Sequence, residues 1–227
     1  MTKLIISPSK LEQFRCYYDE EYNGKIQIED IISYLKGEVE WKKEMNYGSA
    51  IHAVLEFGHE KYLQPDGQTC LIKEDEFPEP ISIPLATLQP VLDYRLKYPK
   101  VIHEVKVRKL IEVSGYQVLL NMRVDGMFGL GIHEHKNPQD KGFTTYESYE
   151  KSSQWKVYLY ATGANFVQYN IFKWKETKRR GFEIIPETYT YYRFPTMEWE
   201  VISLVQHLIN FCERQGLIHL LESKFDK

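Results

Sequence analysis

The sequence of 227 residues contains only three cysteines, and it has no long hydrophobic run. Cys16, Cys70 and Cys212 are odd in number and far apart, so they indicate neither a disulfide framework nor a zinc knuckle. No apolar stretch approaches the roughly 20 residues of a membrane-spanning helix. The first residues hold one basic side chain and an apolar stretch too short for a signal peptide. These absences predict a protein of a reducing, intracellular compartment.

An excess of charge of one sign is also missing, because 32 acidic residues nearly balance 29 basic ones. The hydrophobic fraction of 43% and the aromatic fraction of 14% argue against a disordered chain. The charge is unevenly spread, however. Residues 1–90 carry 9 basic and 16 acidic residues, whereas residues 91–227 carry 20 and 16. This asymmetry indicates either a polyanion-binding half or ordinary variation of the surface.

The spacing of apolar residues predicts that residues 1–97 form a mainly helical lobe. The first helix begins either with Ser7 as its cap and Pro8 in its first turn, or with a capping box that starts at Ser9. Further helices are expected over three ranges: 27–36, 47–62 and 85–97. Proline and glycine predict that residues 64–84 form an irregular connection.

Residues 98–227 change to the pattern of strands and predict a sheet-containing core. Three consecutive strands in a meander are expected at 101–113, 116–128 and 130–137. The remaining expected elements are a helix over 152–165, strands over 166–174 and 186–194, and a helix over 196–215. No repeat or linker divides the chain. We therefore expect one α/β domain, with the helical N-terminal lobe beside the sheet.

Charged residues cluster on two of the predicted strands. Asp125 lies near the end of one strand, and alternation puts Glu134 and Lys136 on one face of the next. If these strands pair, two carboxylates and one ammonium group converge. Two carboxylates suit a hard divalent cation such as Mg²⁺ or Mn²⁺, and a nearby lysine can orient or deprotonate water or stabilise a developing phosphate charge. Such a combination can hydrolyse a phosphodiester.

Other interpretations of these residues stay open. Asp125 is compatible with a simple turn, and Glu134 with Lys136 is compatible with an exposed charge pair. His133 and His135 form a rival His-x-His metal pair on the opposite face of the strand. A basic cluster near a predicted turn indicates either a phosphate-contacting loop or a solvated hairpin tip. That cluster consists of Lys173, Lys175, Lys178, Arg179 and Arg180.

Two further motifs complete an ordered set. His52 follows Gly48 by four residues near the start of a predicted helix, and Gln154 and Tyr158 share one helical face after the strands. Along the chain the set is the Ser-Pro-Ser helix, Gly48-x-x-x-His52, Asp125, Glu134-His135-Lys136 and Gln154-x-x-x-Tyr158. With these motifs, residues 5–175 resemble the PD-(D/E)xK nuclease superfamily, in particular its RecB-like exonuclease branch. The resemblance implies a restriction-endonuclease-like core, with a mixed central sheet flanked by helices.

The resemblance also implies a metal site. Asp125 and Glu134 would be metal ligands, together with the backbone carbonyl of His135. His52 would correspond to the histidine that binds a metal in RecB-like members, and Glu104 is a secondary candidate on the first strand of the meander. The implied cofactor is one or two Mg²⁺ or Mn²⁺ ions.

The remaining motif residues would act on the substrate. In the resemblance, Lys136 is the catalytic lysine, and Gln154 and Tyr158 bind DNA and position the active site. Many RecB-like relatives also hold a 4Fe–4S cluster with four cysteines, one of which Cys16 would match. The three cysteines of this chain cannot build such a site, so we expect no iron–sulfur cluster. Asn121 stands where relatives commonly have glycine.

The predicted function is that of a deoxyribonuclease, most simply an exonuclease that acts on DNA ends in recombination, repair or replication. The alternatives are a structure-specific or restriction-type endonuclease, a catalytically idle nucleic-acid-binding protein on the same fold, or a His-x-His metalloprotein acting on a small molecule. Single- or double-stranded DNA is the expected partner, recombination or replication proteins are candidate partners, and no membrane is expected. The expected location is the cytoplasm of a bacterial or phage-infected cell, and the compact chain suggests a phage source.

Overall fold

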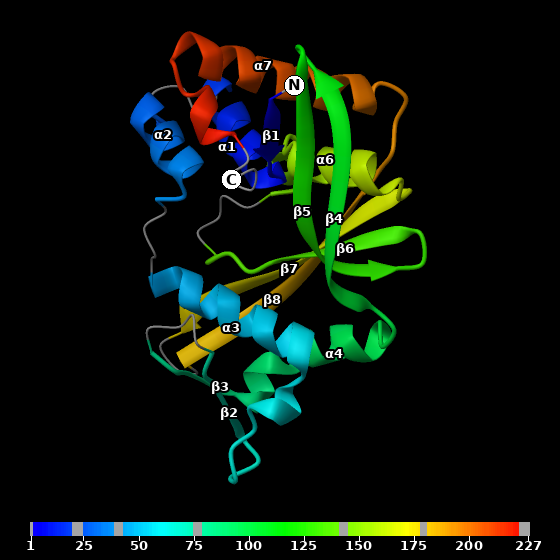
Figure 1. Cartoon of the computed structure of the whole chain (residues 1–227). Helices are drawn as coiled ribbons and strands as arrows, with labels where there is room; N and C mark the ends of the chain where they lie inside the picture. The colour runs from blue at the N-terminus through cyan, green and yellow to red at the C-terminus, as the bar shows by residue number, and fades with distance from the viewer. Residues whose placement is uncertain are drawn as a thin grey trace.

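The computed structural model describes residues 2–19, 25–38, 43–74, 79–140, 145–177 and 181–222. The strands are β1 (Lys3–Ile6), β2 (Thr69–Ile72), β3 (Ile81–Pro84), β4 (Ile102–Val113), β5 (Tyr116–Phe128), β6 (Gly131–Lys136), β7 (Phe166–Thr177) and β8 (Gly181–Tyr192). The helices are α1 (Pro8–Tyr18), α2 (Ile28–Lys36), α3 (Lys43–Phe57), α4 (Gln89–Lys97), α5 (Tyr146–Glu150), α6 (Gln154–Thr162) and α7 (Met197–Arg214). Figure 1 shows a central sheet with helices on both sides.

The main sheet is mixed, as the sequence predicts. One edge of β5 pairs with β4 along its length, while the other edge carries β1 near the start of β5 and β6 near its end. β1 and β5 are parallel, as are β6 and β7, whereas β7 and β8 are antiparallel. The predicted meander of β4, β5 and β6 is confirmed, and so is the α/β fold with a central mixed sheet flanked by helices.

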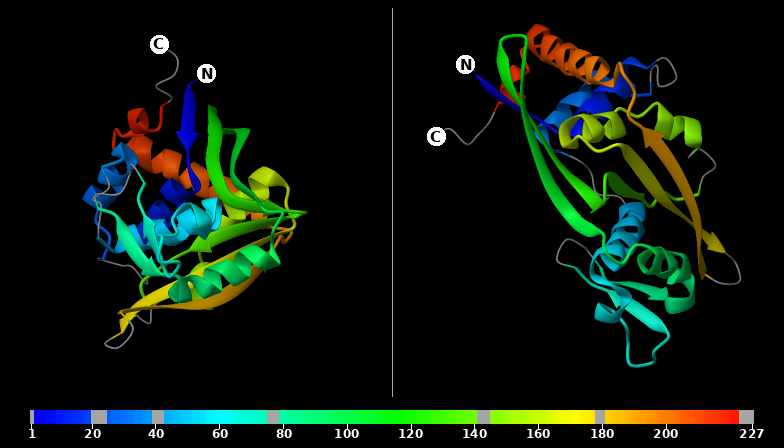
Figure 2. Two further views of the ribbon diagram at one scale, coloured as in Figure 1. Left: turned by 90° about the horizontal axis from the view of Figure 1, so that it is seen from below. Right: turned by 90° about the vertical axis from the view of Figure 1, so that its right-hand side faces the viewer.

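The two faces of the sheet are covered by different helices. Along β7, Tyr169 and Ile171 join one hydrophobic cluster, and Phe172 and Trp174 join another. Alternation along a strand explains this division, because successive side chains point to opposite faces. Helices α1, α6 and α7 belong to the first cluster, and α3 and α4 with the β2–β3 pair belong to the second. The right-hand view of Figure 2 shows these two groups at opposite ends of the molecule.

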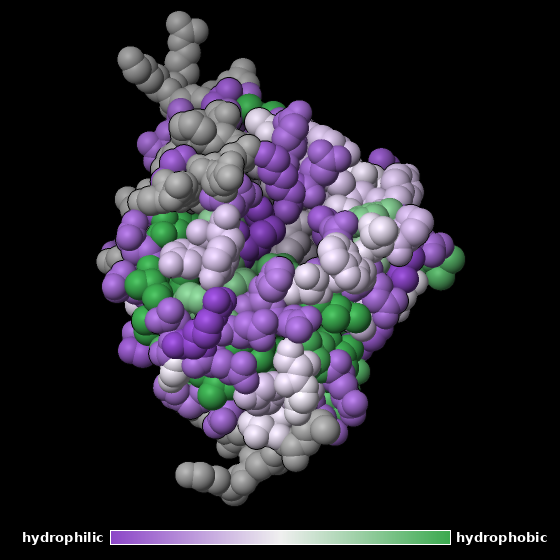
Figure 3. Space-filling view, turned by 90° about the horizontal axis from the view of Figure 1, so that it is seen from above, coloured by the Kyte–Doolittle hydropathy of each residue, from purple (hydrophilic) through white to green (hydrophobic). Residues whose placement is uncertain are grey.

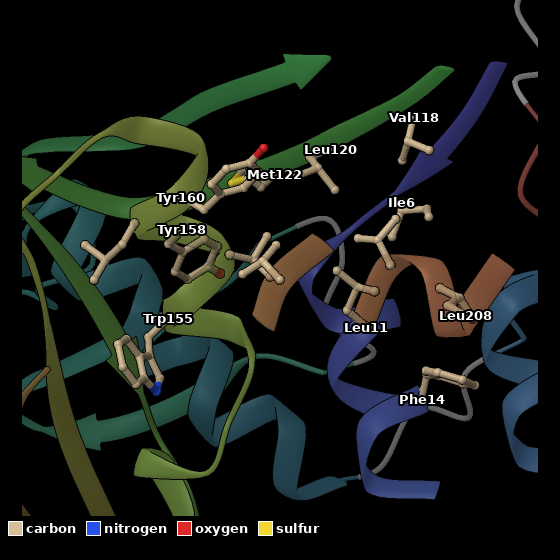
Figure 4. Packing of buried hydrophobic residues seen from close by; sticks show 14 of the residues in the cluster. Ile6, Leu11, Phe14, Val118, Leu120, Met122, Trp155, Tyr158, Tyr160 and Leu208 are labelled. Atoms are coloured by element: carbon tan, nitrogen blue, oxygen red, sulfur yellow. The ribbon is translucent and has the colours of Figure 1, made fainter. Parts of the chain in front are cut away.

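The first cluster holds in place the helices that lie next to the charged motifs. Ile6 of β1 and Leu120 of β5 are fully buried against Leu11 of α1 and Leu208 of α7, as Figure 4 shows. Burying one such side chain contributes about 1.5–3 kcal/mol. Tyr158 of α6 lies in the same cluster, so the helix that carries the Gln-x-x-x-Tyr motif is anchored in the core.

Two local predictions, the start of the first helix and the connection over 64–84, can be compared with the structure. Ser7 caps α1 by accepting a hydrogen bond from the Lys10 amide at 3.3 Å, and Pro8 occupies the first turn, so the first of the two predicted starts is correct. The prediction of an irregular connection over 64–84 is wrong in part. Four-residue strands β2 and β3 pair there in antiparallel fashion, because Cys70, Ile72, Ile81 and Ile83 turn inward against α3 and α4.

The expected division near residue 97 stays a prediction. The helices of the first 97 residues are shared between the two clusters, since α1 and α2 pack with the first and α3 and α4 with the second. None of the helices in the described ranges could span a membrane. On the face shown in Figure 3, hydrophobic residues are interspersed with hydrophilic ones.

Candidate active site

The charged motifs meet where two strands separate. The ladder between β5 and β6 runs from Phe128–Gly131 to Gly126–His133 and ends there. Asp125 precedes Gly126 on β5, and here its side chain rather than its backbone bonds to β6. Asp125 Oδ2 accepts a hydrogen bond from the His135 backbone N–H at 2.7 Å. A side chain at Gly126 would place Cβ 2.5 Å from Cγ1 of Val101, so this close approach requires glycine.

On one face of β6, four side chains form a continuous hydrogen-bond network. Lys136 Nζ donates to Glu134 Oε1 at 2.8 Å and to Gln154 Oε1 at 2.9 Å. Tyr158 donates its hydroxyl to the same Glu134 oxygen at 3.0 Å and accepts from Gln154 Nε2 at 2.9 Å. The sequence pattern of Glu-x-Lys and Gln-x-x-x-Tyr therefore becomes one cluster, with Glu134 only 3% exposed at its centre.

The start of α6 is held by a residue that the sequence did not reveal as part of the site. Glu12 of α1 accepts from the Ser153 backbone N–H at 2.6 Å and from the Ser153 hydroxyl at 2.8 Å. Arg15 pairs with the other Glu12 oxygen at 2.8 Å. Because Ser153 precedes Gln154, this contact fixes where the helix presents its polar face. The two residues are 141 positions apart, so no local pattern could have indicated the contact.

On the other side of Asp125 lie His52 and Glu104. His52 Nε2 is 3.2 Å from Asp125 Oδ1 and 3.7 Å from Glu104 Oε1, so α3 brings its motif histidine to the fork. Glu104 has a φ of +55°, a conformation that residues other than glycine rarely adopt. Arg123 Nε pairs with its Oε2 at 2.5 Å. Non-glycine residues in this region tend to occur at functional sites, where the surrounding structure holds the strain.

The surroundings of Glu134 and Asp125 shift the pKa values of these two carboxylates in opposite directions. Burial, and then the negative charge of Asp125, raises the pKa of Glu134 to about 7. Burial also opposes ionisation of Asp125, but the hydrogen bond and charge of His52 outweigh it and keep the pKa of Asp125 below its usual range. For Lys136, burial lowers the pKa, yet the charges of Glu134 and Asp125 raise it overall. Lys136 is therefore positively charged at neutral pH.

The two histidines of β6 point to the opposite face, as alternation predicts, but their surroundings differ. His133 Nδ1 is hydrogen-bonded to the Tyr94 hydroxyl at 3.0 Å. His135 is 5% exposed, and neither of its ring nitrogens has a hydrogen-bond partner among the described residues. Burial lowers the pKa of His135 to about 3, so its ring is neutral. His133 joins no potential metal-binding group among the described residues, and the predicted His-x-His pair does not meet on one site.

The donor atoms present fit a divalent cation. His52, Asp125 and His135 each offer a ligand atom within 4.8 Å of the others, and His52, Glu56 and Glu104 form a second such group. Glu134 belongs to neither group, but its Oε2 is buried and has no hydrogen-bond partner within the described part of the chain. A buried oxygen with no partner costs free energy that a bound cation would recover. Beside these residues opens a cleft of about 560 Å³, lined among others by Ala53, Phe57 and Lys106.

The predicted basic cluster is only partly described. Lys173 pairs with Glu187 at 2.8 Å and Lys175 with Glu183 at 3.5 Å, both across β7 and β8. Lys178, Arg179 and Arg180 lie outside the described residues. A DNA-binding role for the cluster stays a prediction.

A different basic surface, which the sequence did not single out, lies next to the hydrogen-bond network. Lys106 and Arg108 of β4 and Arg123 of β5 line a cavity of about 410 Å³ together with Tyr158. Residues two positions apart on a strand share a face. The Lys106-Val107-Arg108 sequence could therefore have indicated this basic surface.

Comparisons with solved structures show the fold. SSO0001 aligns with a TM-score of 0.50 and 16% identity, covering 92% of this chain and 76% of that one. The "Putative exonuclease" from Eubacterium rectale aligns with a TM-score of 0.51 and 14% identity, covering 94% and 82%. The alkaline exonuclease LHK-Exo from Laribacter hongkongensis has a TM-score of 0.47 and 13% identity, covering 93% and 92%. The sequence matches no protein family and no curated protein.

Proposed function

We propose that this protein is a metal-dependent deoxyribonuclease that hydrolyses phosphodiester bonds, and that it acts as an exonuclease on DNA ends. The observation that carries the proposal is the meeting of Asp125, Glu134 and Lys136 at the fork of β5 and β6, with Lys136 Nζ 2.8 Å from Glu134. The motif order in the sequence, which resembles RecB-like nucleases, supports it. So does the fold shared with a protein named as an exonuclease.

Asp125, Glu134 and His52 are the residues that would hold the cation. A Mg²⁺ or Mn²⁺ ion bound there would supply neutralisation of phosphate charge and a lowered pKa for a nearby water molecule. The protein's own contribution begins with Lys136, whose positive charge can stabilise the charge that develops on the phosphate oxygens. Gln154 and Tyr158 hold Lys136 and Glu134 in place by hydrogen bonds of 2.9–3.0 Å.

The basic cavity beside this network supports a polyanionic substrate. Its three cationic side chains, Lys106, Arg108 and Arg123, face the edge of the site that includes Tyr158. Cationic side chains that line a groove attract the DNA backbone whatever its sequence. The overall formal charge of −3 therefore does not oppose DNA binding, because three cationic side chains line the cavity beside the network.

End-labelled linear single- and double-stranded DNA, together with a closed circular DNA, tests the proposal when incubated with Mn²⁺, Mg²⁺ or EDTA. We expect release of short products from linear DNA with either ion, and no cleavage in EDTA. Lys136→Ala should abolish cleavage. The matched control is Lys156→Ala on α6, where the lysine pairs with Glu200 at 2.7 Å, and it should cleave normally.

Each outcome discriminates between functions. Cutting of the closed circle would replace the exonuclease by an endonuclease. DNA binding without cleavage under every condition would replace the nuclease by a binding protein. Unchanged cleavage by Lys136→Ala would remove Lys136 from the catalytic site.

A further inference from the structure

The side chain of His135 is a buried polar group that the proposed chemistry does not use. Only its backbone takes part in the fork, through the N–H that Asp125 accepts. The residue is 5% exposed, and both ring nitrogens lack a hydrogen-bond partner among the described residues. Buried polar atoms are nearly always paired, so an orphaned imidazole at a charged site points to a missing ligand.

His133 is the natural comparison. It lies two residues earlier on the same face of β6 and is also buried, but its Nδ1 is 3.0 Å from the Tyr94 hydroxyl. Among the described residues, one histidine of the strand thus has a hydrogen-bond partner for its ring and the other has none. This difference distinguishes a structural histidine from one available to bind something.

The groups around the His135 ring are metal ligands by their chemistry. The ring centroid of His52 is 5.8 Å from that of His135, and the two planes meet at 66°. One ligand atom from each of His52, Asp125 and His135 lies within 4.8 Å of the others. Donors about 2.0–2.2 Å from a common ion are separated by roughly 3–4.4 Å, so this spacing needs little adjustment to close around a cation.

We propose that the His135 ring, with His52 and Asp125, forms a nitrogen-rich position that prefers a first-row transition ion such as Mn²⁺ to Mg²⁺. Two imidazoles and one carboxylate suit transition ions, whereas Mg²⁺ demands oxygen ligands in a near-ideal octahedron. The inference deepens the proposed function, because it specifies which ion the site selects and adds a ligand from a side chain rather than from the backbone.

Pulsed electron paramagnetic resonance of Mn²⁺ bound to the full chain tests this without DNA. Wild-type protein should show couplings to two histidine nitrogens. His135→Gln should show one, with Mn²⁺ affinity reduced at least about tenfold. The matched variant His133→Gln should keep both couplings and its affinity. A hundredfold excess of Mg²⁺ should leave the wild-type spectrum unchanged, and circular dichroism checks that both variants are folded.

The wild-type spectrum alone can overturn the inference. No bound Mn²⁺, one nitrogen coupling, or displacement by Mg²⁺ would each refute it, as would two couplings that persist in folded His135→Gln. The nuclease assay separates this from the proposed function. Cleavage with a one-nitrogen spectrum refutes only the His135 position, whereas a two-nitrogen spectrum without cleavage of any DNA refutes only the nuclease.

Discussion

Replacing Glu134 by glutamine changes one buried charge at the centre of the hydrogen-bond network and keeps its shape. In the metal-free protein, burial and the nearby Asp125 raise the pKa of Glu134 from 4.5 to about 7. The ionised Glu134 carboxylate therefore destabilises the folded state of the metal-free protein, and a bound cation would reduce this cost. We expect Glu134→Gln to make the metal-free protein more stable while it abolishes cleavage, since active sites often sacrifice stability for function.

The size and pH range of this effect follow from the two pKa values. The unfolded chain releases the Glu134 proton near pH 4.5 and the folded protein near pH 7, so wild-type stability falls between these values. The rise corresponds to about 3 kcal/mol, at about 1.36 kcal/mol for each pKa unit. The variant should therefore match the wild type below about pH 4.5 and exceed it by about 1–3 kcal/mol above pH 7.

Thermal unfolding in EDTA at pH 4.5 and pH 8 measures the difference. For a chain of this length, 1 kcal/mol raises Tm by about 2–4 °C. Glu60→Gln is the matched control, because its side chain is 74% exposed and its replacement should change little. Mn²⁺ at a hundredfold excess over Kd should add about 2.7 kcal/mol to the wild type and so offset the advantage of the variant. A Glu134→Gln variant that is less stable than wild type at pH 8 in EDTA would refute this reasoning.

Two further substitutions test the supports of the site. Glu12→Ala should lower the free energy of unfolding by about 1–2 kcal/mol and slow cleavage, because it leaves the Ser153 N–H at the start of α6 without its charged partner. An unchanged denaturant midpoint and an unchanged cleavage rate would contradict this. Gly126→Ala should cost about 1–3 kcal/mol, since the added methyl group meets Val101 at 2.5 Å; a Tm equal to that of the wild type would show that the strand accommodates it.

Much of the sheet was predictable because the signals in β4, β5 and β6 are local. Segments rich in Val, Ile and Leu and separated by Ser114-Gly115 and Gly129 predict three strands, and the structure forms them with nearly the same bounds. Alternation along β6 also correctly put Glu134 and Lys136 on one face and the two histidines on the other.

What the sequence did not reveal depends on distant contacts. Strands β2 and β3 have four residues each, and the prolines around them outweigh so short an alternating pattern. β1 becomes a strand by pairing with β5, more than 100 residues away. The grouping of the His135 ring with His52 likewise requires α3 to cover that face of the sheet, which no spacing along the chain specifies.

In the proposed function, Asp125 is the residue on which hydrolysis of DNA with a bound cation depends most directly. Single-turnover cleavage of end-labelled linear DNA in Mn²⁺ by wild type and Asp125→Asn tests it most directly. Asparagine keeps the shape and an oxygen for the His135 N–H but removes the negative charge. We predict a rate at least about a hundredfold lower in the variant, with DNA binding retained. A rate within a few-fold of the wild type would contradict the account.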